Sequence, residues 1–169
     1  MTARDGRSRM SIAYLGLGSN VDARANIHSG IAALRASFGE VALSPIYRAP
    51  AVGFSGDDFI NLVARIETGL GPLELRDFLH ALEDHYGRDR SQPKFSDRTL
   101  DIDILLYDDL YLLSPLLEIP RDEILTAAHV LRPLADLAPD LRHPVLRRGM
   151  AELWREFRGE RSGLEVVDL

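Results

Sequence analysis

The sequence contains no cysteine and no apolar run that approaches the length of a membrane-spanning helix. The absence of cysteine excludes a disulfide scaffold, a thiol nucleophile and every zinc or iron–sulfur site that uses cysteine ligands. Because a helix needs ~20 consecutive apolar residues to cross a bilayer, we expect no transmembrane helix. Only one of the 20 basic side chains is a lysine, Lys94, which we attribute to coding bias. The first charged residues precede no apolar stretch of signal-peptide character, so we expect a cytoplasmic protein.

Length and charge narrow the class further. The 169 residues fit one domain, and a hydrophobic content of 46% suffices for a buried core. Lys and Arg number 20 against 26 Asp and Glu, a net charge of −6, which argues against a general binder of nucleic acid or anionic membranes. The sequence has no internal repeat and no flexible linker. We therefore expect a single domain over residues 1–169, with 1–9 as a loose tail, and we expect it to act as a monomer.

Apolar spacing and turn residues predict the order of secondary structure. Strands are expected at 11–18, 40–47, 59–66 and 100–107, and helices at 23–38 and 72–86. A short hairpin is expected at 110–113, a third helix from about 120 to 137 with a kink at Pro133, and a last helix at 150–157. The β-α-β-β-α-β order predicts an α+β, ferredoxin-like core: an antiparallel sheet with helices on one face, followed by C-terminal helices. We expect a site on the exposed face of the sheet or in the loops at its edge.

Two aspartates in the last core strand are the strongest chemical signal. Asp101 and Asp103 are two residues apart, so in a strand they share a face with Cα atoms about 6.6 Å apart. The apolar residues that alternate with them take the other face and can fill the core. Two carboxylates this close favour a hard cation such as Mg2+, which takes oxygen ligands and is shared with substrate phosphates. The alternative is that both aspartates are solvated or paired with arginines.

The loop before this strand is locally basic. Residues 88–98 carry a charge of +2 (4 − 2) from these side chains: Arg88, Arg90, Lys94 and Arg98 against Asp89 and Asp97. Arginines form paired hydrogen bonds to phosphate oxygens and stabilise charge that moves onto a leaving group. Taken alone, the loop is typical of a solvated surface segment. Beside the two aspartates it favours a polyphosphate–magnesium site and phosphoryl-type transfer.

Other motifs are weaker. The segment Gly16-Leu-Gly18-Ser-Asn20 lacks the third glycine of a dinucleotide fingerprint, and no Walker A sequence is present. These glycines therefore indicate close strand packing and a tight turn. Phe59 and Asn61 share a strand face, which suits a flat heterocycle but is more often a core Phe beside a surface Asn. The five histidines lack metal-ligand spacing, and no serine lies in a G-x-S-x-G elbow.

Six blocks of sequence together resemble a known family. They are Ala13–Asn20, Tyr47–Pro50, Phe59–Asn61, Gly87–Arg90, Arg98–Leu105 and Val130–Leu134. Over roughly residues 11–144 the chain is similar to 6-hydroxymethyl-7,8-dihydropterin pyrophosphokinase of folate biosynthesis, whose most specific signature is the Arg-x-x-Asp-hydrophobic-Asp string. The resemblance implies a ferredoxin-like α+β enzyme. It also implies transfer of the terminal pyrophosphate of ATP to the hydroxymethyl group of the pterin, which leaves AMP.

The resemblance also implies roles for single residues. Asp101 and Asp103 match two aspartates that hold a pair of Mg2+ ions, and Arg88 and Arg98 match arginines that engage the polyphosphate; these four are the implied catalytic residues. The implied pterin contacts are Ala49, Val52, Gly53, Phe59, Asn61 and His129. The implied ATP contacts are His80, Glu83, Arg88, Arg90, Phe95, Arg98, Ile104, Arg121 and Asp122. Loops 49–58 and 88–98 match segments that close over the substrates.

Three positions depart from the family pattern. Arg121 and Asp122 follow Pro120 where many members place His, Ala127 replaces an ATP-binding arginine, and His129 replaces an aromatic plate of the pterin pocket. Arg121 could supply the phosphate contact that Ala127 lacks, and His129 can still stack on a pterin. The departures leave two alternatives to the pyrophosphokinase. One is a non-catalytic paralogue that senses a pterin or a nucleotide, and the other is a related kinase that acts on a modified pterin.

Overall fold

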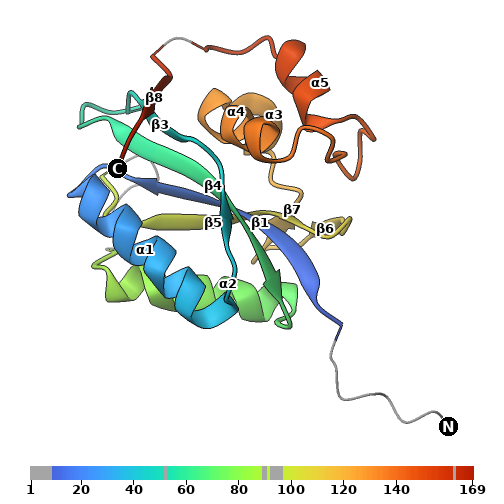
Figure 1. The fold of residues 1–169 in the computed structure, drawn as a ribbon, viewed down its shortest axis with the longest axis horizontal. Helices are drawn as coiled ribbons and strands as arrows, with labels where there is room; N and C mark the ends of the chain where they lie inside the picture. The colour runs from blue at the N-terminus through green and yellow to red at the C-terminus, as the bar shows by residue number, and fades with distance from the viewer. Residues whose placement is uncertain (1–8, 52, 89–90, 92–96, 162) are drawn as a thin grey trace, which may run out of the picture.

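The chain folds around one antiparallel sheet (Figure 1). The computed structural model describes residues 9–51, 53–88, 91, 97–161 and 163–169, so the expected tail at 1–9 lies almost wholly outside the described residues. The strands are β1 (Ser11–Ser19), β2 (Ala42–Leu43), β3 (Ile46–Ala49), β4 (Phe59–Thr68), β5 (Asp101–Tyr107) and β8 (Glu165–Val167). Their order is β5-β1-β4-β3-β8, with β2 also paired to β4. This order confirms the predicted ferredoxin-like arrangement, because β1 lies between β4 and β5.

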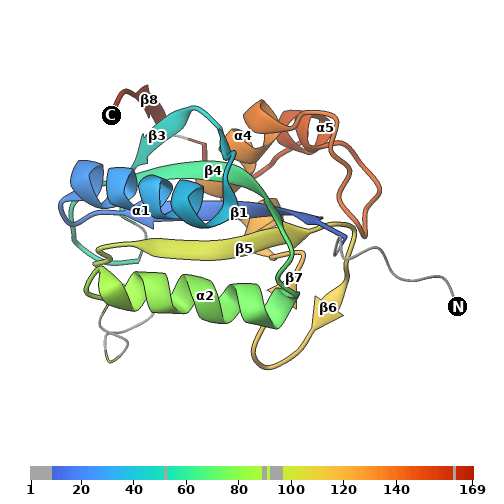
Figure 2. The same ribbon diagram turned by 60° about the horizontal axis from the view of Figure 1, so that its bottom comes forward.

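Helices α1 (Ala23–Phe38) and α2 (Pro72–His85) cover one face of the sheet (Figure 2). Alternate residues of the strands, such as Leu15, Leu62 and Ile102, pack against them in the larger of two buried apolar clusters. Both helices end close to the predicted residues. Gly39 follows α1 with a φ of 77°, a left-handed value that glycine adopts without strain.

Helices α3 (Glu123–Thr126), α4 (Ala128–Leu137) and α5 (Met150–Arg155) lie on the opposite face (Figure 1). They pack on a second apolar cluster to which the sheet contributes Tyr14, Val63, Leu105 and Leu106. Consecutive leucines reach the same face because the pairing of β1 with β5 shifts by one residue between Tyr14 and Leu15. The sheet face that we expected to be exposed is therefore covered where these side chains lie. Gly18, Asn61, Asp101 and Asp103, which face the same side, belong to neither buried cluster.

Several element boundaries differ from the prediction. The strand expected at 40–47 is split into β2 and β3. Pro45 has no N–H to donate to a neighbouring strand, and Ser44 bonds to β4 through both its backbone and its side chain. The Ser44 N–H donates to the Val63 carbonyl and the Ser44 Oγ accepts the Val63 N–H, each at 2.9 Å. The expected hairpin is longer: β6 (Leu112–Leu113) pairs with β7 (Glu118–Ile119). Strand β8, which pairs with β3, was not predicted.

The third helix, expected as one element from about 120 to 137, is divided into α3 and α4. Pro133 lies inside α4, and the chain breaks instead at Ala127, whose extended backbone (φ −123°, ψ 117°) separates α3 from α4. The Ala127 carbonyl accepts the N–H groups of Val130 and Leu131 at the start of α4. The break lets each short helix bury its own apolar residues, Ile124 from α3 and Leu134 among those from α4. Burial therefore decides the boundary here, and proline does not.

Candidate active site

One row of cross-strand neighbours forms the floor of the site. Gly18 of β1 pairs with Asn61 of β4 on one side and with Asp101 of β5 on the other, and Gly16 pairs with Asp103. Cross-strand partners project to the same face of a sheet. The amide of Asn61 and the two carboxylates therefore lie on the face opposite α1 and α2, with glycines between them.

The two glycines keep this floor open. A Cβ on Gly18 would lie 3.0 Å from Oδ1 of Asn61, and a Cβ on Gly16 would lie 3.4 Å from Cδ2 of Leu105. The sequence predicted close packing and a turn at these positions. The structure adds that they remove side chains from the space between the amide and the carboxylates.

Asp101 and Asp103 share a strand face, as their spacing predicts. Their side chains are 35% and 30% exposed, whereas Ile102 and Ile104, which alternate with them, are buried in the core. Burial, together with the neighbouring Asp101 carboxylate, raises the pKa of Asp103 to about 7. Two carboxylates that repel each other in this way favour a bound cation over two free negative charges.

Arg88 links the first aspartate to helix α2. Its Nη1 donates to Oδ1 of Asp101 at 2.9 Å and to Oε2 of Glu83 at 3.2 Å. The same Glu83 oxygen accepts the N–H of Ile102 at 3.2 Å. Burial and the charge of Asp101 raise the pKa of Glu83 to about 8. Glu83, expected to contact ATP, is buried, and in the described part of the structure it holds Arg88 and the edge of β5.

Arg98 lies three residues before the start of β5 and is also buried. Its Nη1 donates to the Asp97 carbonyl at 3.1 Å. Burial and the charge of Arg88 lower the pKa of the Arg98 guanidinium, while Asp101 raises it. Both expected catalytic arginines, Arg88 and Arg98, therefore lie in the electrostatic field of the aspartate pair.

Arg121 approaches the second aspartate from the segment that follows β7. Its Nε lies 3.7 Å from Oδ2 of Asp103, and its guanidinium also pairs with Glu123 at 3.1 Å. Its backbone N–H donates to the Leu105 carbonyl at 2.9 Å, which fixes the residue beside β5. Asp122, its neighbour and another expected ATP contact, is exposed at the start of α3.

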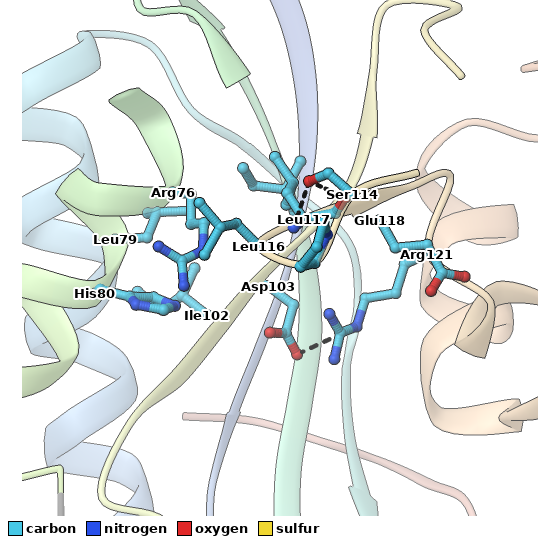
Figure 3. A pocket seen from close by; sticks show the side chains of 12 residues that line it. Arg76, Leu79, His80, Ile102, Asp103, Ser114, Leu116, Leu117, Glu118 and Arg121 are labelled. Atoms are coloured by element: carbon cyan, nitrogen blue, oxygen red, sulfur yellow. Dashed lines mark hydrogen bonds and ion pairs between the residues drawn. The ribbon is translucent and has the colours of Figure 1, made fainter. Parts of the chain in front are cut away.

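A pocket of about 250 Å³ opens beside this ion pair, between α2, β5 and the β6–β7 hairpin (Figure 3). The residues that line it are Arg76, Leu79, His80, Ile102, Asp103, Ile104, Ser114, Pro115, Leu116, Leu117, Glu118 and Arg121. Three of them, His80, Ile104 and Arg121, were expected to contact ATP. Arg76 and the hairpin residues 114–118 were missed, because no motif marks a hairpin that only the fold brings to β5.

Across the floor from this pocket lie the expected pterin residues. Phe59 pairs with Ala49 of β3, and its ring meets Phe54 edge-on at 6.3 Å between centroids. Asn61 is buried, and its Nδ2 has no hydrogen-bond partner among the described residues. A buried amide donor without a partner is costly, so Nδ2 marks a position where a ligand acceptor fits.

His129, at the start of α4, is influenced electrostatically by residues of the site. Burial lowers the pKa of His129, while Glu123 and then Asp101 raise it. The imidazole thus lies in the electrostatic field of Glu123 and Asp101, and burial favours its neutral form. Gly53 lies exposed in the loop after β3 with a φ of 82°. Three other expected contacts, Val52, Arg90 and Phe95, lie outside the described residues.

Asn20, which directly follows β1, is a structural residue of the site to which no sequence motif assigned a role. Its Nδ2 donates to the Asp57 carbonyl at 3.1 Å and to Oδ1 of Asp97 at 2.8 Å. Its Oδ1 accepts the N–H of Arg98 at 2.7 Å. One amide side chain therefore joins the loop that carries Gly53 to the segment that leads into β5. A side-chain amide with both donor and acceptor capacity, placed next to a strand end, was the available signal.

The aspartate pair fits a magnesium site that the substrate completes. In the part of the chain that the structure describes, no group of three or more His, Asp or Glu side chains could hold a metal ion by itself. Mg2+ commonly binds through one or two carboxylates and the phosphates of its substrate. Asp101 and Asp103 supply that number of carboxylates, and arginine guanidinium groups already stand opposite both of them.

A family model matches residues 14–139 and carries the description 7,8-dihydro-6-hydroxymethylpterin-pyrophosphokinase (HPPK). The chain belongs to this family. The matched segment contains the floor glycines, both aspartates, Arg121 and His129. Family membership thus confirms the resemblance inferred from the sequence blocks.

Relatives named 2-amino-4-hydroxy-6-hydroxymethyldihydropteridine pyrophosphokinase agree with this assignment. The protein of Pseudomonas aeruginosa is 42% identical over 135 residues, which cover 78% of this chain and 83% of the relative. That of Methylorubrum extorquens is 35% identical over 165 residues, 94% of this chain and 100% of the relative. That of Aquifex aeolicus is 34% identical over 155 residues, 90% of this chain and 94% of the relative.

Solved structures support the fold. The HPPK-DHPS A437G structure of Plasmodium falciparum with STZ-DHP superposes with a TM-score of 0.73 at 14% identity. The match covers 90% of this chain and 46% of that one, so this chain spans about half the length of its structural neighbour.

Among the described residues no helix is long and apolar enough to cross a membrane.

Proposed function

We propose that this pyrophosphokinase transfers the pyrophosphoryl group of ATP to the hydroxymethyl group of 6-hydroxymethyl-7,8-dihydropterin, a step of folate biosynthesis, at the site around Asp101 and Asp103. The observation that carries the site assignment is the row Asn61–Gly18–Asp101. It joins a buried amide donor that has no partner among the described residues to a pair of carboxylates, and a pocket of about 250 Å³ opens beside them.

The pterin fits the Asn61 half of the row. A pterin is flat and carries ring acceptors and donors at its edge, so the Nδ2 donor of Asn61 and the ring of Phe59 suit its edge and its face. His129 lies in the same electrostatic environment, and its neutral imidazole can stack on a ring. This placement directs the hydroxymethyl group toward the aspartates.

ATP fits the pocket between α2, β5 and the β6–β7 hairpin. Ile102 donates its N–H to Glu83 and not to β1, so this edge of β5 faces outward, and Ile104 presents its backbone groups at the same edge. An unpaired strand edge offers both a donor and an acceptor to the rim of a purine base. The phosphates then lie toward Arg121, Arg88 and Arg98, whose guanidinium groups suit phosphate oxygens.

In the transfer, the pterin hydroxyl oxygen attacks the β-phosphorus of ATP. The bond from the β-phosphorus to the oxygen that bridges it to the α-phosphorus breaks, and AMP leaves with that oxygen. The arginines stabilise the charge that moves onto it. Asp103, which shares a strand face with Asp101, is our candidate to accept the hydroxyl proton. Asp101 and Asp103 would hold the magnesium, which would supply Lewis acidity and lower the pKa of the hydroxyl.

Two further parts of the proposal concern the working state. We take Mg2+, two ions with ATP, as the cofactor, because the carboxylate pair lacks further protein ligands among the described residues. We also propose that the protein works as a monomer in the cytoplasm. The acidic, cysteine-free composition supports the cytoplasmic location.

An assay of AMP release tests the function. The reaction contains ATP, Mg2+ and 6-hydroxymethyl-7,8-dihydropterin, with the double variant Asp101→Ala/Asp103→Ala as the blank. We expect AMP from the intact protein only, and only with the pterin present. Intact protein that binds both ligands and releases no AMP would instead favour a sensor or a kinase for a modified pterin, with Arg121 and His129 as the first positions to revert.

A further inference from the structure

Arg121 has two carboxylate partners of unequal quality. Its Nε and Nη2 lie 3.2 and 3.1 Å from Oε1 of Glu123, which are hydrogen-bond distances. Its Nε lies 3.7 Å from Oδ2 of Asp103, an ion pair without a hydrogen bond. The guanidinium is therefore held firmly by Glu123 and only electrostatically by the aspartate.

The first aspartate also faces an arginine. Arg88 donates to Asp101 at 2.9 Å, so each carboxylate of the proposed magnesium site has a guanidinium as its counter-ion. A guanidinium and a divalent cation that share one carboxylate repel each other. In this arrangement the metal binds only if it displaces the arginines or if another anion binds them instead.

The surroundings of Arg121 provide such an anion. Its side chain is 33% exposed and lines the nucleotide pocket beside Asp103 (Figure 3). The triphosphate that we place in this pocket is more strongly charged than one carboxylate, and guanidinium groups pair with phosphate in two-pronged fashion. Because Glu123 holds the guanidinium, Arg121 can leave Asp103 without losing a hydrogen bond.

We propose that Arg121 is an exchangeable counter-ion of the metal site: it pairs with Asp103 while the nucleotide pocket is empty and moves to the phosphates when ATP binds. The inference rests on the proposed function. It goes beyond a phosphate contact, because it makes metal binding conditional on the nucleotide. Metal alone binds weakly, and metal and ATP enter together.

Binding of Mn2+ to the nucleotide-free protein tests the inference. The loss of the free Mn2+ signal in electron paramagnetic resonance gives the dissociation constant without any turnover. We expect Arg121→Met to bind Mn2+ about three- to fivefold more tightly than the unaltered protein, the range of a partly exposed ion pair. The matched control is Arg148→Met, which removes the same charge from an arginine paired with Glu152 at 2.7 Å on α5. We expect no change in that variant.

A double-mutant cycle separates exchange from a general field effect. Glu123→Gln removes the second carboxylate partner of Arg121 and leaves Asp103 as its partner, so Mn2+ should bind more weakly. A general loss of structure cannot tighten Mn2+ binding in Arg121→Met while it weakens Mn2+ binding in Glu123→Gln. If Glu123 acts through Arg121, the double variant Arg121→Met/Glu123→Gln matches Arg121→Met alone. Additive effects, or an Arg121→Met constant equal to that of the unaltered protein, would overturn the proposal.

The same titration with α,β-methylene-ATP, whose bridging carbon blocks transfer, separates this inference from the function on which it rests. We expect the analogue to tighten Mn2+ binding in the unaltered protein and to reduce or remove the advantage of Arg121→Met. Intact protein that takes up no Mn2+ even with the analogue contradicts the magnesium site itself. Uptake with the analogue, but identical constants without it, contradicts only the counter-ion role.

Discussion

Asn61 and Gly18 are cross-strand partners, and Oδ1 of Asn61 lies 3.0 Å from the position that a Cβ on Gly18 would take. The amide of the proposed pterin pocket is thus oriented by the absence of a side chain on the neighbouring strand. A single methyl group on Gly18 would therefore disturb the position of the amide that faces the ligand.

Gly18→Ala is therefore expected to weaken pterin binding about tenfold, since the added Cβ pushes the amide out of its position. Binding of α,β-methylene-ATP is expected to change little. Calorimetric titration of each ligand measures both. Gly16→Ala is the matched control on the same strand, because its Cβ would meet only the Leu105 side chain at 3.4 Å. Equal losses of pterin affinity in the two variants would contradict the assignment of Asn61.

Phe59→Ala is expected to raise the pterin dissociation constant by about tenfold or more, because it removes the aromatic face on which the heterocycle stacks. ATP binding should remain nearly unchanged, since the nucleotide pocket is lined by other elements. Phe38→Ala, which removes a ring packed edge-on against Phe78 between α1 and α2, is the control. That variant should lose stability and keep its pterin affinity. Parallel losses for both ligands in Phe59→Ala would argue against the pocket.

Asn20→Ala is expected to lower the melting temperature by roughly 4–8 °C, the consequence of losing ~2 kcal/mol when the N–H of Arg98 is left unsatisfied. Asn20→Asp should be less stable still. The aspartate keeps the acceptor for the Arg98 N–H. It replaces the Nδ2 donor, which lies 2.8 Å from Oδ1 of Asp97, with a second negative charge. Thermal melts of the three proteins give the ranking. An aspartate variant as stable as the unaltered protein would refute the bridging role of Asn20.

His143 is expected to make the protein acid-sensitive. It is buried, burial lowers its pKa, and its Nδ1 accepts the N–H groups of Val145 and Leu146, each at 3.2 Å. The unfolded chain, with a pKa near 6.5, then binds the proton more readily than the folded chain does. The contribution of His143 to stability is full above pH 6.5 and is lost as the pH drops through the folded value.

Urea unfolding at several pH values between 5 and 7.5 measures this slope. His143→Asn keeps an acceptor for both N–H groups but does not titrate, so its stability should depend less steeply on pH. The remaining slope is the sum of two opposite effects: the lowered pKa of His129 acts in the same direction as His143, and the raised pKa values of Asp103 and Glu83 act against it. Identical slopes in the two proteins would show that His143 does not carry the effect.

Local pattern was enough to predict most of the fold. Helix α1 covers the predicted residues because its apolar spacing and Gly39 act within a few turns of chain. The order of strands and helices, together with the sequence blocks, also led to the correct family. The errors lie where local rules compete with burial: Ala127 breaks a helix that Pro133 was expected to kink, and β8 exists only because β3 offers it an edge.

For the site, the sequence by itself determined the chemistry of the strand that carries Asp101 and Asp103, because a period of two residues fixes which side chains share a face. Only the tertiary structure decided what stands opposite them. Gly18 and Asn61 meet Asp101 through strand pairing, and Arg121 reaches Asp103 from a segment 18 residues further along the chain (121 − 103). Such distant neighbours follow from the register of the sheet and the packing of the hairpin, and neither is encoded in the spacing of any one motif.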